Sequence, residues 1–144
     1  MSMEIHVFFS GLPPLPLAVT KAMEQLGLDF AISDPDSGFE LGGFMPMTNG
    51  SGMGAIETGT EVYLGSAKEM IDALGIEGID PKLEHEISFR WGSDFMEGAC
   101  AIALSAAIAK LTNGVIWEDS SGEVLSIENA VEICHEMTAA GKRQ

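Results

Sequence analysis

Three glutamates stand four residues apart near the end of the chain, at Glu128, Glu132 and Glu136. On a helix this spacing brings all three carboxylates onto one face. Like charges at that spacing oppose each other by about 0.2 to 0.5 kcal/mol per pair, so the stripe slightly disfavours folding. A solvated helix face is the simplest account of any one of these acids. Taken together, they indicate a docking surface for something basic.

A pair of acids, Glu118 and Asp119, follows a predicted strand over residues 115–117. Two carboxylates at a strand end suit general acid and base work if a cleft opens there. The chain has 22 acids, however, so adjacent pairs are expected by chance and solvated surface is the simpler reading. We group Glu118 and Asp119 with the glutamate stripe as partner-binding residues.

The three histidines and two cysteines form no metal-binding spacing such as Cys-x-x-Cys or His-x-x-x-His. We therefore expect no metal, no cofactor and no assigned catalytic residue. Cys100 and Cys134 both fall in apolar helical patterns, which is typical of small buried side chains. A cysteine nucleophile assisted by His85 remains an alternative, because such partners need be adjacent only in space.

The composition limits the classes of partner. Seven Lys and Arg against 22 Asp and Glu give a net charge of −15, while 46% of the 144 residues are apolar. That much apolar content buries a core, so we expect one globular domain over 1–144. The negative charge disfavours nucleic acid and anionic membranes and favours a basic protein partner. The opening residues lack the pattern of a signal peptide, so a cytoplasmic protein is expected.

Hydrophobic periodicity predicts an α+β fold with about four helices, near 14–26, 66–74, 94–112 and 127–140. The helix over 94–112 is apolar nearly all round, which predicts the most buried element of the domain. Alternating residues predict strands from Glu4 to Phe9 and from His85 to Trp91. A glycine-rich segment over 38–65 predicts a bent hairpin. We expect a mixed, mostly antiparallel sheet of five or six strands.

Three segments carry a resemblance to a known family: Ile87-Ser88-Phe89-Arg90-Trp91-Gly92, the Ala-rich helix after it, and Gly114-Val115-Ile116-Trp117-Glu118-Asp119 before the last amphipathic helix. Over roughly residues 85–140 the chain resembles small bacterial immunity proteins that accompany polymorphic or secreted toxins. The resemblance implies a cytoplasmic antitoxin that binds a cognate effector and blocks its active site. It supplies no binding residues, because such interfaces diverge rapidly.

Two other classes of function stay open. One is a small enzyme or ligand-binding domain with a pocket under the glycine-rich hairpin, for which His85, Glu86 and Arg90 are the favoured residues. The other is a structural homo-oligomer, such as a homodimer, built on the apolar helix and the nine methionines. A deep pocket that unites a titratable pair would favour the first class. A flat acidic face would favour the inhibitor.

Overall fold

The structure, a computed structural model, describes residues 2–36, 38–39 and 42–144. The strands in these ranges are β1 (Met3–Phe9), β2 (Phe30–Ile32), β3 (Gly43–Asn49), β4 (Ile56–Ser66), β5 (His85–Trp91), β6 (Val115–Glu118) and β7 (Glu123–Leu125). The helices are α1 (Pro16–Gln25), the 3-10 turn η2 (Gly52–Gly54), α2 (Ala67–Leu74), α3 (Phe95–Thr112) and α4 (Ile127–Arg143). Each of the four predicted α-helices is therefore present.

The strands form one sheet in the order β2-β3-β4-β5-β1-β6-β7, with every neighbouring pair antiparallel. This confirms the predicted α+β class, with one strand more than the expected five or six. β1 lies near the middle of the sheet, between β5 and β6. β2 lies at the edge, and three strands, β3, β4 and β5, separate it from β1.

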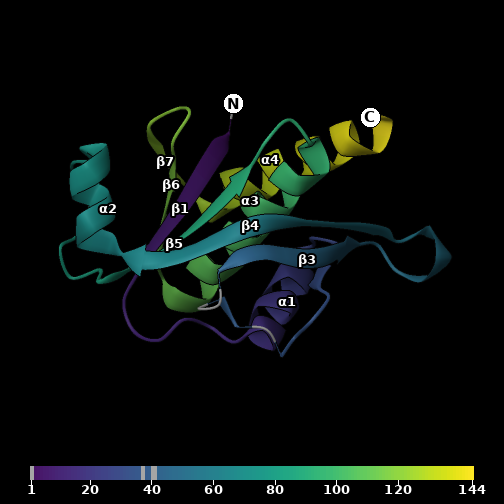
Figure 1. Ribbon diagram of the computed structural model, residues 1–144, viewed down its shortest axis with the longest axis horizontal. Coiled ribbons are helices and arrows are strands. Elements are labelled where there is room, and N and C mark those ends of the chain that lie inside the picture. Colours follow the sequence, from purple (N-terminus) through teal and green to yellow (C-terminus); the bar gives the residue numbers. More distant parts are fainter. Residues whose placement is uncertain (1, 37, 40–41) are drawn as a thin grey trace.

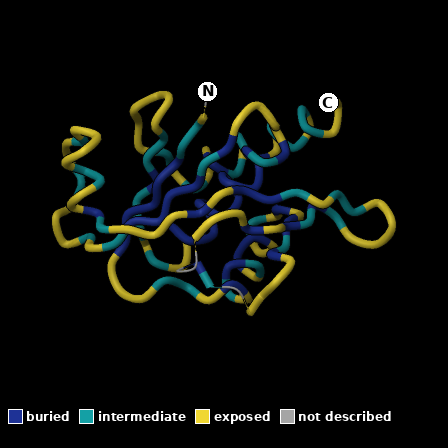
Figure 2. Tube along the Cα trace, in the orientation of Figure 1, coloured by how far each residue is buried: buried dark blue, intermediate teal, exposed yellow. Residues whose placement is uncertain are grey.

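One face of the sheet is covered by helices (Figure 1). α3 packs on β1, β4 and β5, and it also contacts α1 and α4. The inward-facing residues of β1 are Ile5, Val7 and Phe9, each with no exposed surface. Figure 2 shows the buried residues gathered in the middle of the molecule, while the far end of the β3–β4 hairpin is exposed.

Helix α3 is the core helix, as its composition predicts. Thirteen of its 18 residues are buried, and Leu104 has no exposed surface. By length and composition alone this helix is long enough and apolar enough to cross a membrane, and 72% of it is buried inside the domain. Burial of that kind is typical of the core helix of a soluble domain.

Side chains cap the first turns of α3 and α4. The Asp94 carboxylate accepts the N–H groups of Met96 (2.8 Å) and Glu97 (3.3 Å) at the start of α3. Ser126 accepts the N–H of Asn129 (3.0 Å) at the start of α4. Such caps satisfy N–H groups that have no partner inside the helix, and each typically contributes about 1 kcal/mol.

Candidate functional site

The candidate site is a pocket between the start of α3, the middle of α4 and the β6–β7 hairpin. Its volume is about 620 Å³, within the range of about 300 to 1,000 Å³ usual for small-ligand sites. Its apolar walls come from three strands and two helices, namely Met3, Trp91, Ile102, Leu125, Ile133 and Met137. Phe95 stands at the pocket with 46% of its surface exposed.

The Trp91 side chain packs against α3 at Gly98, which has no side chain of its own. A Cβ atom added at Gly98 would lie 2.6 Å from Trp91 Nε1 and would also collide with the end of Met137. Glycine at this position of α3 therefore lets the indole ring and Met137 approach the helix backbone. Both residues then line the pocket wall.

Three acids and no base occur among the described residues that line the pocket: Asp94, Glu118 and Glu123. Glu118 and Glu123 face each other in the β6–β7 pair. Glu118 Oε2 accepts the Ser121 N–H at 2.7 Å, and Oε1 accepts the Ser120 N–H at 3.2 Å and the Ser120 hydroxyl. Burial acts to raise the pKa of Glu118, but these hydrogen bonds outweigh burial and lower it. Glu118 is thus kept as a carboxylate beside an apolar cavity.

The other four predicted partner-binding residues do not line this pocket. Glu128, Glu132 and Glu136 are all exposed on α4, the helix whose Ile133 and Met137 line the pocket. Asp119 is exposed and donates its backbone N–H to the Glu4 carbonyl at 3.3 Å. Of the five predicted residues only Glu118 lines the pocket, and the sequence analysis did not predict this apolar cavity.

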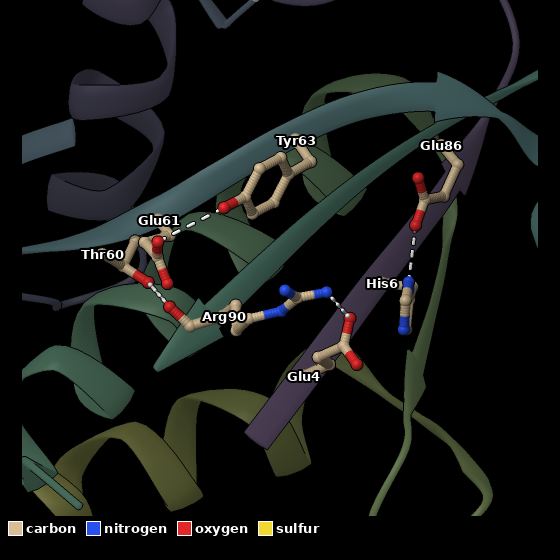
Figure 3. Close-up of polar contacts among 7 residues, drawn as sticks. All are labelled: Glu4, His6, Thr60, Glu61, Tyr63, Glu86 and Arg90. Atoms are coloured by element: carbon tan, nitrogen blue, oxygen red, sulfur yellow. Dashed lines mark hydrogen bonds and ion pairs between the residues drawn. The ribbon is translucent and has the colours of Figure 1, made fainter. Parts of the chain in front are cut away.

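The residues favoured for an enzyme, His85, Glu86 and Arg90, do not converge. Alternation along β5 sends His85 to one face of the sheet, where its ring lies 5.6 Å from that of Phe9. Glu86 and Arg90 point to the opposite face (Figure 3). None of the three lines the apolar pocket.

On that opposite face, Glu86 and Arg90 have different partners (Figure 3). His6 Nδ1 lies 2.5 Å from Glu86 Oε2, and both side chains are buried. Arg90 donates to Glu4 Oε1 at 3.1 Å and stacks over Tyr63 at 5.3 Å. The Glu4 carboxylate is the largest reason why the pKa of Arg90 is raised. The arrangement therefore holds two separate polar pairs, His6 with Glu86 and Arg90 with Glu4.

Two further hollows adjoin the β3–β4 hairpin, near the place expected for the alternative ligand site. One is about 130 Å³ and lies against Phe39 and Phe44. The other is about 480 Å³ and is lined by residues that include Glu57, Thr58 and Glu97. Burial first, and then repulsion from Asp94 and Glu61, raises the pKa of Glu97.

Cys100 and Cys134 are both buried and unpaired, as expected. The Cys134 thiol donates to the Ala99 carbonyl at 3.4 Å, and the Cys100 thiol faces the Thr58 hydroxyl at 3.7 Å. Burial is the main reason why the pKa of each thiol rises to about 12. A nucleophilic thiolate is therefore disfavoured at neutral pH.

The apolar helix that suggested self-association is used inside the domain, because α3 is buried. Large apolar side chains are instead exposed before and at the start of α1, where Leu12, Leu15 and Leu17 lie in the segment rich in proline. A homodimer would have to use a face of this kind and not α3.

No protein-family model matches this sequence, and comparison with curated proteins and with solved structures found no significant match. Within the described residues, no group of three or more His, Cys, Asp or Glu side chains is arranged to hold a metal ion.

Proposed function

We propose that this protein is a non-enzymatic, cytoplasmic binding protein of the immunity type. It neutralises a cognate basic toxin by protein–protein contact. The contact surface comprises the exposed face of α4, with Glu128, Glu132 and Glu136, and the neighbouring β6–β7 turn, with Glu118 and Asp119.

The observation that carries the proposal is the exposure of the acidic stripe on α4. Its glutamates make no described ion pair, although their repulsion costs folding free energy. Complementary charge accelerates association with a basic partner and selects against wrong ones. The exposed ring of Phe95 supplies an aromatic group of the kind that anchors interfaces.

The test is binding to the product of the neighbouring gene, measured with both proteins purified at low ionic strength. A variant with Glu128, Glu132 and Glu136 all changed to glutamine should associate at least several-fold more slowly. Its matched control changes Glu24, Glu69 and Glu77 to glutamine, which removes the same charge from exposed positions on other elements. No binding by the parent protein would refute the proposal, and equal slowing by both variants would refute the choice of α4.

A second function is favoured by one observation, the hollow of about 480 Å³ beside the β3–β4 hairpin. There a carboxyl group with a raised pKa, Glu97, lies among polar and apolar residues, as in many ligand sites. A small-ligand or enzymatic role would be supported by ligands whose binding shifts the NMR signals of Thr58 and Glu97. Ligands that shift neither signal would count against it.

A further inference from the structure

We infer that the pocket between α3, α4 and the β6–β7 hairpin is a binding site for a hydrophobic cation, a small molecule with an apolar body and one amine group. The pocket shares Glu118 with the proposed toxin contact, but the inference does not rest on that contact, because it is argued from the cavity and its lining residues and is tested without the toxin. The size, the wall and the charge of the pocket each point to this class of ligand.

The cavity is large enough and apolar enough for the body of such a molecule. Indole, thioether and branched aliphatic side chains from separate elements line a volume of about 620 Å³. Apolar walls with few polar groups are the usual composition of a small-ligand site. Trp91 adds an aromatic group to this wall, and aromatic rings attract cations.

The polar residues that line the pocket select the charge of the ligand. Its described members include three carboxylates and no Lys, Arg or His. Of these, Glu118 is fixed by Ser120 and Ser121, and its lowered pKa keeps it ionised at neutral pH. A fixed carboxylate beside an apolar wall favours an ammonium group and repels an anion.

The start of α3 also reaches the pocket, and a free helix N-terminus would favour an anion. Its N–H groups are already occupied. The Phe95 N–H donates to Gln144 Oε1 at 3.0 Å, and Asp94 accepts those of Met96 and Glu97. The helix end therefore does not reverse the preference for a cation.

The test uses the purified protein and three probes with the same apolar body: phenylbutylamine, phenylbutanol and phenylbutyrate. Binding is followed by NMR through the Trp91 indole N–H and the methyl groups of Met3 and Met137. Trp117, which does not line the pocket, is the internal reference. We expect the amine to bind most tightly and the carboxylate most weakly.

Two kinds of variant locate the site. Glu118→Gln keeps one of the two oxygens that accept from the serines but removes the charge, so it should weaken amine binding by about fivefold and leave the alcohol unchanged. Glu77→Gln, at an exposed position outside the pocket, is its matched control and should change neither. Ile133→Trp fills the cavity and should abolish binding of all three probes. Leu125→Trp repeats that test from a different element if the first variant folds poorly.

The inference is wrong if phenylbutyrate binds as tightly as phenylbutylamine, or if the amine leaves the Trp91 and Met137 signals unmoved. It is also wrong if no probe binds while Ile133→Trp weakens binding to the neighbouring gene product. In that case the pocket receives a side chain of a protein partner. Failure of the toxin proposal alone would leave the probe results unaffected.

Discussion

His6 Nδ1 lies 2.5 Å from Glu86 Oε2 in the middle of the sheet, and each residue is only 1% exposed. The His6 ring stacks near Phe8 and tilts against Trp117. His6 Nε2 has no hydrogen-bond partner among the described residues. A buried polar pair of this kind depends on both members, because either one alone would be left without compensation.

We therefore predict that His6→Phe and Glu86→Met each lower the free energy of unfolding by about 3 to 5 kcal/mol. The double variant should recover most of this loss, since it leaves no buried polar group unpaired. Denaturant unfolding of the parent, the two single variants and the double variant measures the coupling free energy between His6 and Glu86. Single variants within about 1 kcal/mol of the parent would show that the pair carries little energy.

Substitutions at two glycines test how closely Trp91 packs on α3. Gly98→Ala should destabilise the domain by about 1 to 3 kcal/mol, because the added methyl group meets the rigid indole ring. Gly92→Ala is the control, since nothing lies within 4 Å of a Cβ atom there, and it should change stability by less than about 0.5 kcal/mol. Equal thermal midpoints for the two variants would contradict the described packing.

Burial of the thiols predicts their chemistry. The pKa of both Cys100 and Cys134 is raised to about 12, so both stay protonated near pH 8 in the folded protein. A thiol reagent should label neither cysteine in the native state and both in denaturant. Because the unfolded thiols ionise at lower pH than the folded ones, they also make stability fall as the pH rises from about 9 towards 12. Rapid native labelling at neutral pH would refute this account.

The burial of α3 predicts the effect of a charge in the core. Leu104 has no exposed surface, so Leu104→Asp would place an unpaired carboxylate inside the domain and should unfold it. Far-ultraviolet circular dichroism and a thermal melt measure the result. A cooperative melt near that of the parent would show that α3 is misplaced.

Much of the fold could be predicted because local signals agree with it. Ser126 before the periodic residues of α4 and Asp94 before α3 fix where those helices begin. The order of the strands could not be predicted. Alternation shows which face a residue takes but not which strand lies beside it, and β1 pairs with β5, so that His6 meets Glu86 from 80 residues away.

The candidate site was predictable only in part for the same reason. The acids of α4 repeat along one element, so their spacing shows a shared face. The pocket instead joins Trp91, Leu125 and Ile133 from three elements, and nothing in their local sequence relates them. The only local signal was that Ile133 and Met137 stand four apart on α4, which reads equally well as core packing.

In the proposed function, the acidic face of α4 receives a basic protein. Its most direct test is the association rate constant between this protein and the neighbouring gene product, measured by stopped flow at low and at physiological ionic strength. We predict a fall of about tenfold or more as salt is added, and a much flatter response when Glu128, Glu132 and Glu136 are glutamines. Absence of binding at low ionic strength, or a rate constant indifferent to salt, would contradict it.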